Sequence, residues 1–295
     1  MPLAVPLHAI LIAVAVHSLW GGNPVAVKFG LIVFPPLWSA FFRFALGIVC
    51  VLIWARLRGE RIWPRRGEWG PLLLIGSLFT VQIWLMNLGF GLTTGAMGSV
   101  LIATNPIFAA FFVHLLISGD RLTWVRGAGL ALAMAGAAVC LLQDADPAAL
   151  DFGAIGNWIT LTSAGLLGLR LALSARALRQ MDPARVAVWQ MLISLPLYAL
   201  GGALFETIRW EQLAWQPVAG IVYQGVVVAG LAFTVSFSLM KRYTPSVVMS
   251  FNFVSPVAGV LLSAWLLDER ITPLLLLGMA LVALGLALVA RGSGR

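Results

Sequence analysis

One stretch of the chain occurs twice, once in each half. Residues 120–141 read DRLTWVRGAGLALAMAGAAVCL, and residues 269–290 read ERITPLLLLGMALVALGLALVA. The copies share an arginine, a threonine and two glycines at matching positions: Arg121 with Arg270, Thr123 with Thr272, Gly129 with Gly278, and Gly136 with Gly285. An apolar run of about 20 residues with glycines one heptad apart is typical of a helix in lipid. We therefore predict two related halves of membrane-spanning helices, at residues 1–143 and 150–291.

Composition supports a membrane protein. Hydrophobic residues make up 61% of the chain and charged residues only 10%, whereas a soluble domain carries about 25% charged residues. Cys50 and Cys140 both lie inside apolar runs, so neither a disulfide framework nor a metal site is indicated, and we expect no cofactor. The net charge of +8 would suggest nucleic acid in a soluble protein, but here the positive charges follow the topology and no nucleic-acid partner is expected.

Ten apolar runs have the length that about 30 Å of hydrocarbon requires. They lie near residues 7–30, 35–55, 69–92, 95–117, 124–143, 152–175, 184–204, 215–239, 245–267 and 272–290. Helices are expected because a helix satisfies its own backbone hydrogen bonds in lipid. The predicted fold class is thus an all-α integral membrane protein with ten transmembrane helices.

The distribution of lysine and arginine predicts the orientation. If the N-terminus is inside, the inner connectors and the C-terminal tail hold fourteen Lys and Arg residues, and the outer connectors hold two. Such a bias places both termini in the cytoplasm. Five helices in each half then invert the second half relative to the first, which is typical of carriers that work by alternating access around a central cavity.

Three segments carry a resemblance to a known family. Residues 19–30 read LWGGNPVAVKFG, Thr104–Pro106 read TNP, and the pattern returns at Val254–Thr272. The chain resembles the drug/metabolite transporter superfamily, specifically its ten-helix members built from two EamA-type repeats. Within it, the chain is most similar to bacterial aromatic and neutral amino-acid exporters. The resemblance implies a central cavity lined by the first, third, fourth, sixth, eighth and ninth helices.

The first helix holds the densest polar group. His17, Trp20 and Asn23 lie within two turns, and Trp20 could bridge the other two. The sequence Gly21-Gly22 followed by Pro24 loosens the helix, so backbone groups could meet a ligand. A substrate-binding wall and a set of helix-packing contacts both remain open as interpretations.

Other polar residues of the apolar runs complete the candidate site. Gln82 and Met86 share one face of the third helix and suit a broad-specificity apolar site, although packing against a neighbouring helix is an equal alternative. Further substrate-binding candidates are Ser99, Thr162, Gln224 and Asn252. Pro24, Pro106 and Pro256 are candidate hinges or gates, with a structural kink as the alternative.

Charged residues limit the coupling mechanism. All eleven Asp and Glu residues lie in connectors or at helix ends, so proton antiport through a carboxylate is disfavoured. Either a facilitator or weak proton coupling through His17 is expected instead. Lys28, Arg43 and Arg170 fall inside predicted helices; a substrate carboxylate could use one of them, but a structural or interfacial role is favoured.

These observations favour a secondary transporter that exports amino acids across the bacterial inner (plasma) membrane. The partners expected are a small-molecule substrate and the lipid bilayer, with the protein as a monomer or homodimer. Export of another metabolite or drug is the first alternative, and a non-transport membrane protein is the second. An enzyme is not expected, because the sequence shows no clustered nucleophile, base or metal-ligand set.

Overall fold

The computed structural model describes residues 7–116, 123–142, 155–232, 234–235, 239, 252 and 254–292. Every regular element among them is helical. The first half contains α1 (Leu7–Gly21), α2 (Asn23–Val33), α3 (Pro36–Leu57), α4 (Trp69–Leu92), α5 (Gly95–Ile102), α6 (Asn105–Leu116) and α7 (Trp124–Leu142). The second half contains α8 (Ile155–Ala177), α9 (Pro183–Phe205), η2 (Trp210–Gln212), α10 (Trp215–Val222), η3 (Tyr223–Ala232), α13 (Val254–Leu266) and α14 (Pro273–Gly292).

Length and composition make this a multi-pass membrane protein. Within the described ranges, eight helical segments are long and apolar enough to cross a membrane, and two shorter apolar helices span Val254–Leu266 and Pro273–Val289. Every one of the ten apolar runs predicted from the sequence overlaps one of these segments. The prediction of an all-helical membrane fold is confirmed.

Two of the predicted helices are divided by a short break. The first run breaks at Gly22, between α1 and α2, and Pro24 is buried at the start of α2. The fourth run breaks at Ala103 and Thr104, and Pro106 lies in the first turn of α6. Proline is tolerated at these positions because the first turn of a helix has no partner for its N–H groups.

The eighth run changes its helix type, which the sequence did not predict. It begins as α10 and continues from Tyr223 as the ten-residue π-helix η3. The backbone of η3 approaches α3 closely at two glycines: a Cβ on Gly225 would lie 2.7 Å from Leu46 Cβ, and a Cβ on Gly230 would lie 2.7 Å from Cys50 Cβ. Glycine is required at both positions because no side chain fits there.

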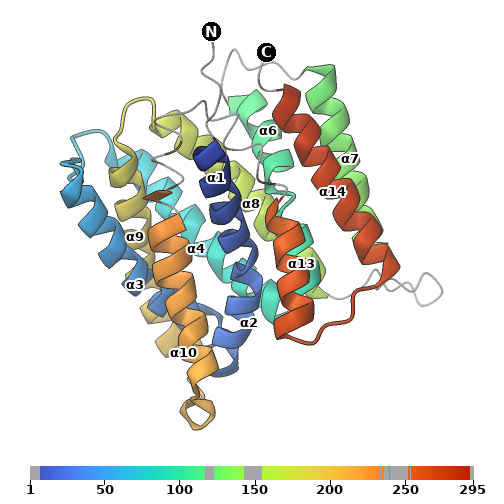
Figure 1. Cartoon of the computed structure of the whole chain (residues 1–295). Coiled ribbons are helices and arrows are strands. Elements are labelled where there is room, and N and C mark those ends of the chain that lie inside the picture. The colour runs from blue at the N-terminus through green and yellow to red at the C-terminus, as the bar shows by residue number, and fades with distance from the viewer. Residues whose placement is uncertain are drawn as a thin grey trace.

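The helices form one bundle (Figure 1). The pair α7 and α14 lies at one edge, α3, α9 and α10 lie at the other, and α1 and α2 run between them. In this view α1 begins and α14 ends at the same end of the bundle. The arginine-rich connector at residues 58–68 meets the start of α9, where Arg185 forms ion pairs of 2.9 Å with Glu68 and 3.1 Å with Asp182.

Sequence-related glycines contact each other crosswise between α7 and α14. A Cβ on Gly129 would lie 2.7 Å from the carbonyl oxygen of Gly285, and a Cβ on Gly136 would lie 2.7 Å from that of Gly278. Gly129 aligns with Gly278 in the repeated stretch, and Gly136 aligns with Gly285. A rotation that exchanges the two copies therefore exchanges the two contacts.

Two further pairs of contacts follow the same pattern when α3 is matched with α9, and α4 with η3. Gly76 of α4 packs against Ile193 of α9, and Gly225 of η3 packs against Leu46 of α3. The N-terminus of α3 is capped by Glu206, which follows α9, and the N-terminus of α9 is capped by Glu60, which follows α3. Glu206 accepts hydrogen bonds from Leu37 N (2.9 Å) and Trp38 N (3.1 Å), and Glu60 accepts one from Ala184 N (3.3 Å). Carboxylates at helix N-termini are stabilising because unpaired N–H groups and the helix dipole meet them.

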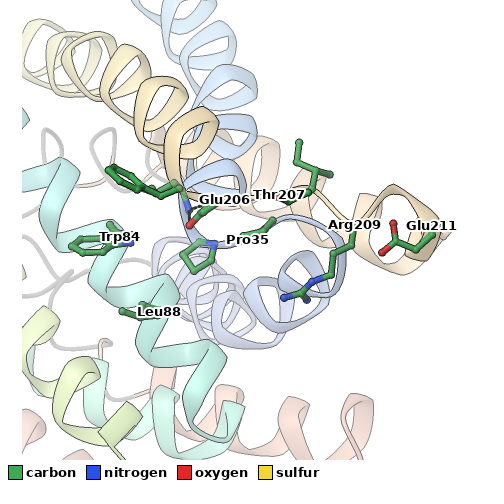
Figure 2. A pocket seen from close by; sticks show the side chains of 11 residues that line it. Pro35, Trp84, Leu88, Glu206, Thr207, Arg209 and Glu211 are labelled. Atoms are coloured by element: carbon green, nitrogen blue, oxygen red, sulfur yellow. Dashed lines mark hydrogen bonds between the residues drawn. The ribbon is translucent and has the colours of Figure 1, made fainter.

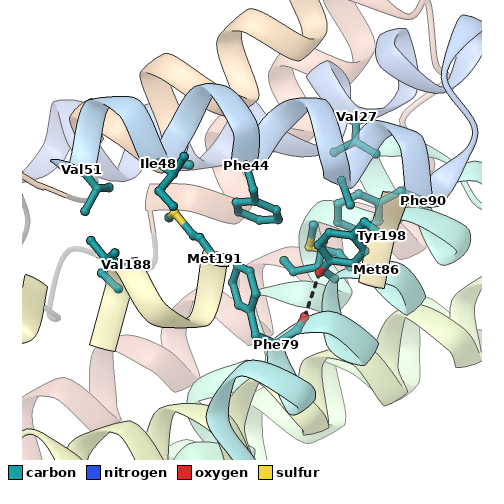
Figure 3. Packing of buried hydrophobic residues seen from close by; sticks show 14 residues of the cluster. Val27, Phe44, Ile48, Val51, Phe79, Met86, Phe90, Val188, Met191 and Tyr198 are labelled. Carbon is teal, nitrogen blue, oxygen red and sulfur yellow. Dashed lines mark hydrogen bonds between the residues drawn. The ribbon is translucent and has the colours of Figure 1, made fainter. Parts of the chain in front are cut away.

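The largest hydrophobic cluster lies mainly between α3, α4 and α9 (Figure 3). The rings of Phe44 and Phe79 lie 4.7 Å apart, and the rings of Phe44 and Tyr198 are stacked at 6.2 Å. The buried Tyr198 hydroxyl lies within hydrogen-bond distance of two carbonyl oxygens of α4, Phe79 O at 3.3 Å and Thr80 O at 3.2 Å. A polar group is thus accommodated inside the cluster because α4 supplies acceptors.

The glycine contact between α7 and α14 generates a direct test. We expect Gly136→Ala to lower the melting temperature of the purified protein, because the added methyl has no room and overpacking costs about 1–3 kcal/mol. Gly127→Ala is the matched control: it lies on the same helix, and a Cβ there meets nothing within 4 Å. We expect it to be neutral or slightly stabilising, since alanine is the better helix former. Equal melting temperatures for both variants would contradict the packing.

Candidate functional site

The polar group of the first run lies where α1 meets α13 and η3. His17 is 2% exposed, and its ring meets the Trp20 ring edge-on at 5.5 Å. Asn23 is partly buried, and its Oδ1 has no hydrogen-bond partner among the described residues. The backbone of Gly21 packs against Ser255 and Gly259 of α13. This first group therefore faces the second half of the chain.

A second group joins α4 to α8. Gln82 Nε2 donates to Ser163 Oγ at 3.2 Å, and Ser163 Oγ donates to the backbone oxygen of Gln82 at 2.9 Å. Gln82 Oε1 is buried and finds no partner in the described part of the chain. Met86 lies one turn further along α4 and is buried in the cluster of Figure 3.

On α8, the buried residue at this contact is Ser163. Its neighbour Thr162, predicted to bind substrate, is exposed on the face that also carries Trp158. Adjacent residues of a helix point about 100° apart, so the two side chains cannot share one face.

The remaining candidates lie on several helices. Gln224 of η3 is fully buried; its Nε2 donates to Ala26 O at 3.0 Å, while its Oε1 has no partner within the described ranges. Ser99 of α5 donates to Gly95 O at 2.7 Å, and its side chain lies against Gly259 of α13. Asn252 is partly buried. Of the hinge candidates, Pro24 and Pro256 are buried and Pro106 is partly buried.

Two arginines lie in the interior, and the sequence had favoured only structural or interfacial roles for them. Arg43 of α3 is 6% exposed, and its guanidinium carbon lies 5.1 Å from the centre of the Phe44 ring. Arg170 of α8 lies 4.9 Å from the centre of the Phe79 ring and donates from Nη1 to Gln190 Oε1 at 2.8 Å. The signal available in the sequence was an arginine within the second and the sixth apolar run, with no acidic residue in any run.

Polar contacts hold the C-terminus of α4 and the N-terminus of α5. Both lie at the opposite end of the bundle from residues 58–68. Lys28 Nζ donates to Thr93 O at 2.5 Å and to Phe90 O at 3.3 Å, so this cation caps the C-terminus of α4. The Thr93 hydroxyl is hydrogen-bonded to Asn157 Oδ1 of α8. Glu269, which follows α13, accepts from Gly95 N at 2.7 Å and Ala96 N at 2.9 Å.

A pocket of about 640 Å³ opens at the same end (Figure 2). It is lined by residues of the α2–α3 connector, of α4 and of the segment after α9: Pro35, Pro36, Leu37, Trp84, Leu88, Phe205, Glu206, Thr207, Ile208, Arg209 and Glu211. The sequence candidates are not among its lining residues. Its lining includes Pro36 and Leu37 at the capped N-terminus of α3, and the pocket is therefore peripheral to the candidate site.

The described residues offer little for covalent or metal chemistry. They contain no group of three or more His, Cys, Asp or Glu that could hold a metal ion. Cys140 is buried where α7 packs on Gly278 of α14, and Cys50 packs on Gly230 of η3. Both cysteines therefore serve as small packing residues.

Comparison with known proteins defines the class. The EamA-like transporter family matches residues 7–142 and 154–291, and this chain belongs to that family. It is 26% identical over 309 residues to the uncharacterized inner membrane transporter YedA of Escherichia coli K12, covering 97% of this chain and 91% of YedA. It is 26% identical over 279 residues to a probable terminal-alkyne amino-acid exporter of Streptantibioticus cattleyicolor, covering 92% and 90%. A solved structure, described only as the crystal structure of a protein, matches with a TM-score of 0.69 and 22% identity over 99% of this chain and 100% of that chain. This last likeness concerns the fold alone.

The cap on α3 predicts a pH dependence of stability. Burial raises the pKa of the Glu206 carboxyl, and the hydrogen bonds from Leu37 and Trp38 only partly offset it. A carboxyl with a raised pKa in the folded state favours the protonated form, so its ionisation costs stability as pH rises through that pKa. We expect the wild type to gain melting temperature relative to Glu206→Gln as the pH falls from 8 to 5.

The control for this test is Glu206→Ala, which removes the acceptor for both amides. It should be less stable than the wild type throughout this pH range, by about 1 kcal/mol. A constant difference between wild type and Glu206→Gln at every pH would contradict the assignment.

Proposed function

We propose that this chain is a secondary transporter that exports amino acids, aromatic and other neutral ones, across the bacterial inner membrane by alternating access. In this proposal ten helices form two inverted five-helix repeats, residues 1–143 and 150–291, with both termini in the cytoplasm. Family membership supports transport. The amino-acid exporter of Streptantibioticus cattleyicolor supports the substrate class, and YedA supports the location.

The observation that carries the proposal is the crosswise pairing of equivalent contacts. Gly129 meets Gly285 while Gly136 meets Gly278, and the caps on α3 and α9 are exchanged in the same way. Two halves related in this manner can exchange their conformations, and that exchange turns a cavity from one side of the membrane to the other. Pro24, Pro106 and Pro256 are the proposed hinges, because each lies beside a break or at a helix start.

The proposed binding groups suit a zwitterion with an apolar side chain. Asn23, Gln82 and Gln224 each carry an amide oxygen without a hydrogen-bond partner in the described part of the chain, and such oxygens accept hydrogen bonds from an ammonium group. His17 and Trp20 would contact the polar head group as well, while Trp20 and Met86 receive the side chain. Ser99, Thr162 and Asn252 complete the proposed set, although Thr162 would have to be reached from its exposed face.

Two alternatives remain distinct from this proposal. Export of another small metabolite or drug by the same alternating mechanism would leave amino-acid flux absent while flux of another solute is present. A non-transport membrane protein would move no solute on either gradient. Coupling is a separate question: facilitated diffusion or weak coupling through His17 fits the absence of Asp and Glu from every apolar run.

The test is counterflow of labelled phenylalanine, threonine and methionine into proteoliposomes, at equal pH and with an imposed pH gradient. We expect uptake at equal pH, and a response to the gradient would make His17 the first proton-carrier residue to mutate. Gln82→Leu should raise the KM for these substrates about 3- to 10-fold, the value of one lost hydrogen bond. Gln212→Leu, an exposed residue of η2, is the matched control and should leave the KM unchanged. Wild-type protein that moved none of the three would refute the proposed substrate class.

A further inference from the structure

Two arginines, the buried Arg43 and the partly buried Arg170, have no acidic partner in the described part of the chain. Arg43 is 6% exposed, and its Nε and Nη1 have no hydrogen-bond partner among the described residues. Arg170 has one hydrogen bond, to the neutral amide of Gln190, and its Nε likewise lacks a partner there. A buried cation of this kind is costly unless an anion meets it.

Within the described ranges, no acidic side chain forms an ion pair with Arg43 or Arg170. The full sequence has eleven Asp and Glu residues, and every one lies outside the apolar runs. Those nearest the helix ends are engaged elsewhere: Glu60, Glu206 and Glu269 cap helix N-termini, and Glu68 pairs with Arg185. A bound molecule that carries an anionic group would neutralise Arg43.

The two arginines lie on opposite halves around one aromatic pair. Arg43 lies over Phe44 and Arg170 lies over Phe79, and the two rings are 4.7 Å apart. Phe79 precedes Gln82 by one turn of α4, so the arginines lie next to the second group of candidate binding residues.

We infer that Arg43, with Arg170, forms a subsite for the carboxylate of the transported molecule. This inference rests on the proposed function, and it names a carboxylate as the group that this part of the site binds. A guanidinium can offer two parallel N–H donors to a carboxylate, which gives both strength and orientation. The amide oxygen of Gln82, one turn along α4, then accepts from the ammonium group, and the aromatic pair receives an apolar side chain.

The repeat relationship explains why one arginine is paired and the other is open. Leu46 and Ile193 occupy equivalent positions, and Arg43 and Gln190 each precede them by three residues. Gly21 packs on α13 and Gly168 packs on α6 in equivalent contacts. Asn23 lies two residues after Gly21, and Arg170 lies two residues after Gly168. The bonded pair Arg170–Gln190 thus corresponds to Asn23 and Arg43, which both keep unpartnered atoms within the described ranges. When the halves exchange conformations, Arg43 gains Asn23 and Arg170 is released, so the substrate always meets one open guanidinium.

The experiment measures competition against counterflow of labelled L-phenylalanine in proteoliposomes. Unlabelled 3-phenylpropanoate keeps the carboxylate and lacks the ammonium, whereas L-phenylalaninamide lacks the carboxylate. We expect 3-phenylpropanoate to compete and L-phenylalaninamide to fail at tenfold higher concentration. Arg43→Gln should raise the KM for L-phenylalanine about 10-fold or more, the value of a hydrogen bond to a charged group.

Stability without substrate separates a binding role from a structural one. Because Arg43 is an unpaired buried charge, Arg43→Gln should leave the melting temperature of the ligand-free protein unchanged or raise it. Arg185→Gln is the matched control, since Arg185 is as deeply buried but paired with Glu68 and Asp182. It should lower the melting temperature and leave the KM unchanged.

Several results would overturn the inference. Equal competition by L-phenylalaninamide, or a wild-type KM in Arg43→Gln, would exclude a carboxylate subsite. A fall in melting temperature in Arg43→Gln as large as that in Arg185→Gln would assign Arg43 a structural role. Stabilisation of the ligand-free protein by sodium chloride but not by sodium 3-phenylpropanoate would assign the arginines to a structural anion. If the wild type moves no amino acid at all, the proposed function itself fails.

Discussion

Close approach of helix backbones at glycine is the interaction on which the rest of this structure depends. In lipid, apolar side chains gain little by leaving their solvent, so helices associate through tight packing and internal hydrogen bonds. Here glycine places α7 on α14, α1 on α13, α8 on α6 and η3 on α3, each with no room for a Cβ. The glycines of α7 and α14 that match in the repeated stretch make exchanged contacts, as the proposed two-fold relation between the halves requires.

Charge is arranged in two different ways within this frame. At the helix ends, acidic residues from one part of the chain cap helices of another part, as Glu206 does for α3 and Glu269 for α5. Inside the bundle, Arg43 and Arg170 have no acidic partner among the residues that the structure describes. Each lies over an aromatic ring, and Arg170 also donates to the Gln190 amide. The acidic caps connect distant helices of the bundle. The two arginines are positive charges that can attract a bound anion.

The sequence predicted where the helices lie better than it predicted which side of each helix points inward. Apolar runs of about 20 residues fix where helices lie, and Gly22 and Pro106 marked breaks that occur at α1–α2 and α5–α6. Which residues point inward was harder, as Thr162 and Ser163 illustrate, because lipid-facing and buried positions are both apolar and no amphipathic pattern distinguishes them. The caps by Glu60 and Glu206 join residues far apart in the chain, and the π-helix η3 packs closely on the distant α3, so neither feature was found from local sequence.

Alternation between two conformations is the central claim, and distances at the two ends of the bundle test it most directly. Spin labels at Ile32 and Trp265 report one end, and labels at Arg179 and Leu115 occupy the equivalent positions at the other; all four side chains are exposed. Double electron–electron resonance would be recorded with and without saturating L-phenylalanine, in a background lacking Cys50 and Cys140. We predict that substrate shifts the two distance distributions in opposite directions. Distributions that do not move, or that move together, in a preparation with measured flux would contradict the account.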